Sequence, residues 1–341
     1  MQEAEKKPAD SGRVVYFDLI RIIALFSVIG VHWVGTVKSV SPDGVFYQAL
    51  NHFLETISNL GVPIFFSLSG YLILHSEIGD VLQFYRKRLI RLGIPYLVFS
   101  VIYVVYFTGI EDKEPGKIPL AYIRDILTAQ VHGTHWFVYA LLGFTFAAPF
   151  LSKMLKSLTY REICILLVGS LTLTLLADIY SFFGQHFPLE GSFVFCGNLL
   201  LYIGGYCANR IFSYYEVKRV GLVEKGLMFL LVILFMIQLI HNTFVVTVMI
   251  SSIIFAHVKR IELGIRVESM LRTVSNHSYS IYLIHAAVVS LLWRVFSSTN
   301  VGYVFELLSG YIIVFCISFI AALIIDLFIT DRLISLAYEK K

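Results

Sequence analysis

Apolar stretches free of Asp, Glu, Lys and Arg recur along the whole chain, and short charged segments separate them. The nine stretches are Ile22–Val37, Thr56–Ser76, Leu92–Ile110, Ile126–Ser152, Ile163–Ala177, Gly191–Asn209, Gly226–Val258, Thr273–Trp293 and Leu307–Ile325. A transmembrane helix needs about 20 apolar residues. The polar triplet His241-Asn242-Thr243 predicts a turn between two short spans within Gly226–Val258. The pattern therefore predicts an all-α integral membrane protein with about ten transmembrane helices.

The composition supports this prediction and excludes other classes of protein. The chain has 341 residues, of which 57% are hydrophobic and 15% are charged, whereas soluble domains carry about 25% charged residues. These figures exclude a disordered chain, a basic nucleic-acid-binding protein and an ordinary soluble enzyme. The four cysteines form no CxxC pair and no Cys/His cluster, so we expect no disulfide framework and no metal site.

The distribution of Lys and Arg predicts the orientation. If the N-terminus is cytoplasmic, the inner segments carry 21 Lys and Arg residues and the outer segments carry 5. Cytoplasmic loops are enriched in these residues, so both termini are predicted to face the cytoplasm from a plasma (inner) membrane. We expect a disordered tail at residues 1–12, a single membrane domain at residues 13–335 and a second cytoplasmic tail at residues 336–341.

The first span carries three ionisable residues, which are costly inside a membrane. Asp18 and Arg21 are three residues apart and can form an ion pair on one helix face. Arg21 and His32 are eleven residues apart, so they share a face at a separation of about 16 Å. One stripe would then carry a carboxylate, a guanidinium and an imidazole. The alternative is an ion pair that only orients the helix, with His32 at the outer interface.

Polar residues in the next two spans allow either a packing role or a binding role. Ser69, Gly70 and Tyr71 lie mid-span, where small residues permit close helix packing or the approach of a ligand to the backbone. Arg88 and Arg91 are three residues apart at the start of the following helix. Paired arginines suit bidentate phosphate binding, and the alternative is a positive-inside anchor.

A further polar stripe lies in the span Thr273–Trp293. Ser278, Tyr282 and His285 occur at positions i, i+4 and i+7 and therefore share a helix face. Such a stripe is predicted to face other helices or a water-filled cavity rather than lipid. At the outer surface, His135-Trp136 opens another span, where an interface anchor and a functional role are equally compatible with the sequence.

Taken in order, these motifs resemble acyltransferase family 3, a family of integral membrane acyltransferases. The matching elements are Asp18-x-x-Arg21 with His32, Pro63-x-Phe65-Phe66-x-x-Ser69-Gly70-Tyr71, Arg88-x-x-Arg91 before Pro95-Tyr96, Trp136-Phe137, and Ser278-Tyr279-Ser280-Ile281-Tyr282-Leu283-x-His285. The length is similar to that of the stand-alone O-acetyltransferases of enterobacterial common antigen and other surface polysaccharides. One position departs from the family pattern, because Thr134 stands where a His is usual and His135 lies beside the Trp.

The resemblance implies transfer of an acyl group, usually acetyl, from cytoplasmic acyl-CoA to a hydroxyl of a cell-surface glycan or its lipid-linked sugar precursor. It implies that His32 is the essential histidine, acting as the base or as an acyl-handling residue, that Arg21 and Asp18 complete its motif, and that no metal takes part. It implies CoA binding by Arg88 and Arg91. The remaining matching residues are expected to serve the donor site (Ser69 and Tyr71) or substrate and structural support (Trp136, Ser278, Tyr282 and His285).

Elementary chemistry supports this implication in part. Transfer to an alcohol needs a base, and His is the usual base near neutral pH. Acetyl-CoA is polyanionic, so a cationic cytoplasmic mouth is expected. The expected partners are membrane lipid, acyl-CoA and a glycan acceptor, with no nucleic acid. Two alternatives stay open at this point, namely a transporter or flippase for a lipid-linked saccharide and a non-catalytic partner in polysaccharide export.

Overall fold

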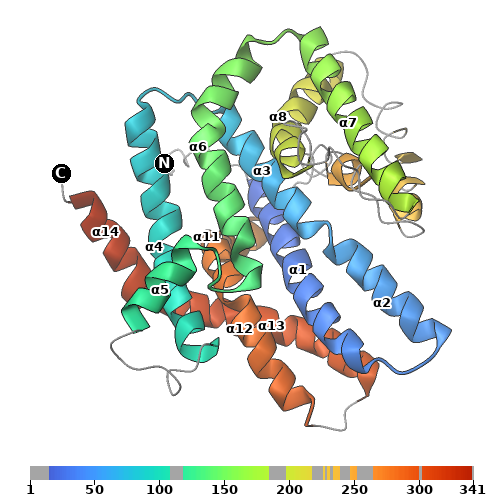
Figure 1. The fold of residues 1–341 in the computed structure, drawn as a ribbon, viewed down its shortest axis with the longest axis vertical. Coiled ribbons are helices and arrows are strands. Elements are labelled where there is room, and N and C mark those ends of the chain that lie inside the picture. The colour runs from blue at the N-terminus through green and yellow to red at the C-terminus, as the bar shows by residue number, and fades with distance from the viewer. Residues whose placement is uncertain are drawn as a thin grey trace, which may run out of the picture.

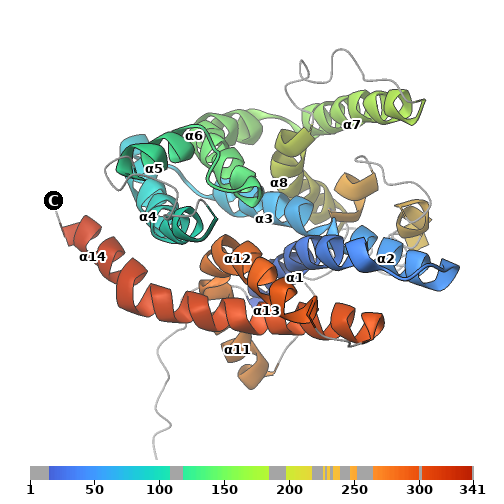
Figure 2. The ribbon, with the colours of Figure 1, turned by 60° about the horizontal axis from the view of Figure 1, so that its bottom comes forward.

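The computed structural model is a bundle of helices (Figures 1 and 2). The structure describes residues 15–107, 118–183, 197–216, 226, 229–230, 233–238, 246–251, 264–298 and 302–339. Within these residues there is no strand, in agreement with the predicted all-α class. The predicted tail at residues 1–12 and the predicted turn at His241-Asn242-Thr243 lie outside the described residues.

Twelve α-helices account for most of the described chain. They are α1 (Val15–Val37), α2 (Val45–Ser58), α3 (Gly61–His75), α4 (Val81–Phe107), α5 (Ile118–Leu127), α6 (Trp136–Ser157), α7 (Tyr160–Phe182), α8 (Gly197–Glu216), α11 (Ile265–Asn276), α12 (Ser278–Phe296), α13 (Tyr303–Ile325) and α14 (Asp331–Glu339). Short 3₁₀ turns occur at Lys38–Val40 and Gly133–His135, and a π-helical turn at Asp326–Thr330 joins α13 to α14.

Seven segments of the described chain are long and apolar enough to cross a membrane. They are Val15–Val40, Val45–His75, Val81–Val105, Gly133–Ser157, Tyr160–Tyr180, Ser278–Phe296 and Tyr303–Glu339. These segments agree with a multi-pass membrane protein. The helix α8 overlaps the predicted span Gly191–Asn209 but is not among the seven, and much of Gly226–Val258 lies outside the described residues. The count of ten spans therefore stays a prediction.

Two helices begin well before the charge-free stretches that predicted them. α1 begins at Val15 rather than Ile22, and α4 begins at Val81 rather than Leu92. The added turns of α1 tolerate charge because Asp18 and Arg21 form an ion pair. Those of α4 tolerate it because Lys and Arg can extend their heads to water while their stems cover apolar surface. As a result, Arg88 lies in the second turn of α4.

The predicted span Ile126–Ser152 also starts too early. α5 ends at Leu127, and Ala129 has φ 58°, a left-handed conformation that a helix cannot continue through. The helix α6 begins only at Trp136, after the 3₁₀ turn. This break positions the residues just before Trp136 against α12, as described below.

The helix α1 lies in the interior of the bundle, where it packs against α2, α3, α11, α12 and α13 (Figure 1). Trp33 on α1 is completely buried and donates its indole N–H to the carbonyl of Leu307 on α13 at 3.0 Å. Gly310, one turn further along α13, faces the same indole, and a Cβ there would lie 1.9 Å from the ring. The absence of a side chain at Gly310 therefore allows α13 to lie against Trp33.

The helices α3 and α8 pack with their backbones in direct contact. A Cβ at Gly70 would lie 1.7 Å from the carbonyl oxygen of Tyr202, and a Cβ at Gly205 would lie 1.9 Å from that of Ser67. Ser67 donates its hydroxyl to the carbonyl of Leu201 at 3.1 Å. Small residues allow such close approach of helices in membranes. The packing role of Gly70, which the sequence left open, is therefore confirmed.

The junctions of α11, α12 and α13 meet at one carboxylate. The predicted span Thr273–Trp293 is divided at His277, which separates α11 from α12. The Nδ1 atom of His277 lies 2.7 Å from Oδ2 of Asp326 in the π-helical turn, and Ser280 donates to Oδ1 at 2.8 Å. Asp326 therefore ties the start of α12 to the end of α13.

The helix α14 continues from the π-helical turn at the end of α13 and packs against α4 (Figure 2). Arg86 donates to the carbonyl of Ala337 at 3.2 Å, and the hydroxyl of Tyr338 donates to the carbonyl of Lys87 at 3.4 Å. The boundary predicted at residue 335 falls inside α14, because this helix runs from Asp331 to Glu339.

Candidate active site

A cavity of about 200 Å³ lies between α1, α3, α4, α6 and α12. Five residues singled out from the sequence line it: Arg21, Ser69, Arg88, Ser278 and Tyr282. Its other lining residues are Phe65, Leu72, Ile73, Leu92, Phe137, Leu141, Thr145 and Tyr279. Pockets for drug-sized ligands measure roughly 300–1,000 Å³, so this cavity has room for only part of such a ligand.

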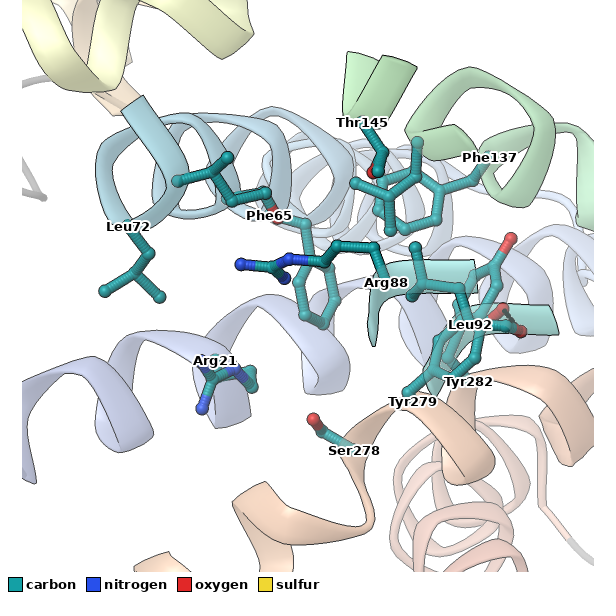
Figure 3. Close-up of a pocket in the computed structure, with 13 residues that line it drawn as sticks. Arg21, Phe65, Leu72, Arg88, Leu92, Phe137, Thr145, Ser278, Tyr279 and Tyr282 are labelled. Atoms are coloured by element: carbon teal, nitrogen blue, oxygen red, sulfur yellow. Dashed lines mark hydrogen bonds between the residues drawn. The ribbon is translucent and has the colours of Figure 1, made fainter. Parts of the chain in front are cut away.

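The cavity has a cationic end and an aromatic end. Figure 3 shows the guanidinium of Arg88 directed away from Tyr279 and Tyr282, toward the side where Arg21 and Leu72 lie. The guanidinium carbon of Arg88 lies over the ring of Phe84, 5.7 Å from the ring centre. The guanidinium groups of Arg21 on α1 and Arg88 on α4 thus lie at one end of an otherwise largely apolar cavity.

Arg21 is held in place by two neighbours. Its Nη1 donates to Oδ1 of Asp18 at 3.2 Å and to the hydroxyl of Ser275 at 2.7 Å. The Ser275 hydroxyl in turn donates to Oδ1 of Asp18 at 2.6 Å, and the Asp18 carboxylate is almost completely buried. The predicted Asp18–Arg21 ion pair is therefore confirmed. Ser275 was not predicted, because it reaches this pair only through the packing of α11 on α1.

His32 lies beyond the aromatic end of the cavity and does not line it. Its ring centre lies 5.1 Å from that of His285, and the His285 ring lies 5.5 Å from Tyr282. Tyr282 is a cavity residue, and its hydroxyl donates to the carbonyl of Thr134. The rings of Tyr282, His285 and His32 therefore form a continuous path from the cavity to His32.

Two more histidines lie near this path. His135 is completely buried, and its ring centre lies 4.5 Å from Tyr103 and 5.5 Å from Tyr96. His132 lies 4.9 Å from Tyr103 by the same measure. Burial lowers the pKa of His132, so its ring is neutral at pH 7, and its Nδ1 accepts the backbone N–H of Thr134 at 3.3 Å.

A family model described as an acyltransferase domain matches residues 14–327 of the chain. The chain belongs to acyltransferase family 3. The match covers the cavity, the histidine path and all the helices that carry them. No curated protein and no solved structure matches the chain. Membership of the family establishes an acyltransferase in general.

In addition to Asp18, His32 and His285, three more residues implied by the family resemblance lie outside the cavity of this acyltransferase. Arg91 is exposed on α4 and is not among the lining residues. Tyr71 packs between Phe17, at 5.1 Å, and His75, at 4.4 Å between ring centres. Trp136 is 45% exposed, whereas its neighbour Phe137 lines the cavity. Of the Arg88–Arg91 pair, only Arg88 reaches the interior.

The candidate site of this acyltransferase therefore consists of a short cavity with guanidinium groups at one end and imidazole rings beyond the other end. Among the described residues, no group of three or more His, Cys, Asp or Glu is arranged to hold a metal ion. The path that includes His285 was not predicted, because the contact between His32 and His285 joins residues more than 250 positions apart. For His132 and His135, the spacing His132-x-x-His135 is the local feature of the sequence that could have indicated that they lie together.

Proposed function

We propose that this acyltransferase takes an acyl group, most simply acetyl, from cytoplasmic acyl-CoA and transfers it to a hydroxyl of a cell-surface glycan or its lipid-linked precursor. The observation that carries the proposal is the cavity with guanidinium groups at one end and a path of rings to His32 at the other. A thioester donor matches this order, since its phosphates are anionic and its acyl end is neutral.

The cationic end suits the phosphates of CoA. Arginine binds phosphate oxygens through charge-assisted, often bidentate hydrogen bonds. Arg88 lies in the second turn of α4, and Arg21 lies near the start of α1, so both are close to the ends that the Lys and Arg count assigns to the cytoplasm. The cavity is smaller than a whole CoA. The nucleotide would therefore lie at the mouth near exposed Arg91, with the pantetheine arm inside.

The imidazole end suits activation of an acceptor hydroxyl. In the transfer, the acceptor O–H bond breaks, its oxygen forms a bond to the acyl carbon, and the carbon–sulfur bond of the thioester breaks. His32 is the proposed base for the hydroxyl proton. It lies four turns further along α1 than Asp18, at about 1.5 Å per residue. The carboxylate therefore acts on Arg21 and not on the imidazole.

The donor half of the proposal is tested by calorimetric titration of the purified protein, in lipid nanodiscs, with acetyl-CoA. Arg88→Ala should weaken binding by roughly 1.5–3 kcal/mol, the contribution of a hydrogen bond to a charged group. Lys87→Ala is the matched control, because it removes the same charge from an exposed neighbouring position. Equal affinities for the wild type and Arg88→Ala would reject this donor site.

The acceptor half is tested by mass spectrometry of the surface glycans of host cells. Cells that carry the wild-type gene should show an added acyl mass that is lost on gene deletion and in His32→Ala. A transporter, a flippase or an export partner is the alternative function, and it would change the amount of surface glycan rather than its acyl mass. Glycan of unchanged acylation in the deletion strain would favour that alternative.

A further inference from the structure

We propose that His285 is a second proton-transfer residue, which works with His32 during acyl transfer. The inference rests on the proposed function and adds to it a residue for which the sequence suggested only substrate or structural support. It is carried by three observations: the hydrogen bond that fixes one nitrogen of the ring, the free state of the other nitrogen, and the position of the ring between His32 and Tyr282.

The hydrogen bond fixes the tautomer of His285. Its Nδ1 is hydrogen-bonded to the backbone carbonyl of Tyr282. A carbonyl oxygen can only accept, so Nδ1 must carry the proton in the neutral ring. The lone pair of the neutral ring is therefore on Nε2. This is how a catalytic base is usually oriented, with one nitrogen held by a hydrogen bond and the other left basic.

The basic nitrogen has no partner among the described residues. The side chain of His285 is completely buried, and its Nε2 is a buried polar atom without a hydrogen bond within this part of the chain. A buried, unpaired polar atom is costly, and the great majority of such atoms in folded proteins are paired. The cost is explained if Nε2 receives a proton in the reaction.

His75 provides an internal comparison. Its Nδ1 is also bonded to a carbonyl one turn back, that of Tyr71, at 2.9 Å. In that ring, however, Nε2 faces the side-chain amide of Asn209 at 3.4 Å, which can donate to it. The same local arrangement is therefore satisfied in His75 and left open in His285. His135 shares the open state, because its Nε2 faces the carbonyl of Leu283 at 3.4 Å and its Nδ1 has no partner among the described residues. What distinguishes His285 is that its ring lies in contact with that of His32.

The position of His285 gives its proton a source and a destination. The ring centre lies 5.1 Å from that of His32, where the acceptor proton arrives, and 5.5 Å from that of Tyr282, which lines the cavity. Among the described residues, His135 and His132 are two further imidazoles that interact electrostatically with His285. The ring contacts place His285 between His32 and Tyr282.

The proposed step balances as follows. The acceptor hydroxyl gives its proton to His32 as its oxygen attacks the acyl carbon, and CoA leaves as a thiolate. His32 passes the proton to Nε2 of His285, which delivers it to the thiolate sulfur. The products are the acylated acceptor and CoA thiol, and both imidazoles return to the neutral form.

The experiment uses the purified protein in lipid nanodiscs and replaces His285 with Asn. The Asn side chain can keep a donor to the Tyr282 carbonyl but has no basic nitrogen. Release of CoA from acetyl-CoA is measured with two acceptors, a glycolipid extract of the host envelope and hydroxylamine. The nitrogen of hydroxylamine attacks a thioester without first losing a proton, so it needs no base. The rate without protein is subtracted.

The expected result separates the two acceptors. With the glycolipid extract, His285→Asn should be slowed at least tenfold, since a base contributes about 10²–10⁴-fold. With hydroxylamine and in acetyl-CoA binding, it should lie within threefold of the wild type. The control His75→Asn makes the same substitution at the satisfied ring and should lie within threefold in both assays.

Two results would overturn the proposal. One is glycolipid transfer by His285→Asn within threefold of the wild type. The other is a parallel loss with both acceptors, or loss of acetyl-CoA binding in both His285→Asn and His285→Gln, since either would show that the ring only supports the fold. A wild-type protein that transfers no acetyl group to the extract would instead reject the proposed function.

Discussion

The contact between α3 and α8 predicts opposite effects for two neighbouring glycines of α8. Gly205 faces the carbonyl of Ser67, and an added Cβ would lie 1.9 Å from that oxygen. Real Cβ atoms essentially never approach closer than 3.0 Å, so Gly205→Ala must move the helices apart by about 1 Å. At Gly204, an added Cβ would have no atom within 4 Å. One methyl group is therefore added at both positions, but only one of them lacks the space for it.

The magnitude follows from three contributions. Overpacking a tight contact costs typically 1–3 kcal/mol. Separating the helices also weakens the Ser67–Leu201 hydrogen bond of 3.1 Å, which is worth about 0.5–1.5 kcal/mol. Replacing Gly by Ala within a helix returns about 0.5–1 kcal/mol. Gly205→Ala should thus lower the free energy of unfolding by about 2 kcal/mol, whereas Gly204→Ala should raise it by about 0.5–1 kcal/mol.

Thermal unfolding of the two variants in the same detergent tests this difference. At about 2 °C per kcal/mol for a large domain, the apparent Tm of Gly205→Ala should lie about 4 °C or more below that of Gly204→Ala. The wild type should lie between them. If both variants shifted the Tm equally, or if Gly205→Ala were the more stable, the backbone contact between α3 and α8 would be refuted.

Three further predictions concern the site and the orientation. Ser275→Ala should weaken acetyl-CoA binding by about 2- to 12-fold, equivalent to roughly 0.5–1.5 kcal/mol, because it removes a partner that positions the Arg21 guanidinium at the cationic end of the cavity; unchanged affinity in calorimetry would contradict this. His32→Ala should lose glycan acylation while binding acetyl-CoA within twofold of the wild type, and acylation near the wild-type level by mass spectrometry would exclude it as the base. A cysteine at Leu120 should be labelled by a membrane-impermeant reagent from outside and one at Glu216 should not; strong outside labelling of position 216 would reverse the topology.

The sequence predicted those features that depend on local spacing. The Asp18–Arg21 ion pair needs only the three-residue spacing of one helix, and the structure contains it at 3.2 Å. The stripe of Ser278 and Tyr282 lines the cavity for the same reason. The membrane-spanning character also followed directly, since it depends on runs of apolar residues that need no knowledge of packing.

Features that depend on how helices meet were not predictable in the same way. The sequence could not choose between packing and binding for Ser69 and Gly70. The structure separates the two residues, with Ser69 lining the cavity and Gly70 packed against α8. The three-residue spacing of Arg88 and Arg91 predicted that they share a helix face, but only Arg88 reaches the cavity. Ser275 joined the site because α11 packs on α1, and no pattern in the chain marks that contact.

The segment Tyr303–Glu339 connects the site to the surrounding bilayer. Only 22% of its most apolar part is buried, so most of this surface faces away from the rest of the protein. It is attached to α1 where Trp33 donates to Leu307, and to α4 where Arg86 donates to Ala337. Helices respond to a change in bilayer thickness by tilting, and a tilt of α13 would displace α14 and the turn of α4 that bears Arg88. We therefore expect the cationic end of the cavity to respond to the thickness of the membrane, so that lipid composition would act on the enzyme without binding in its cavity.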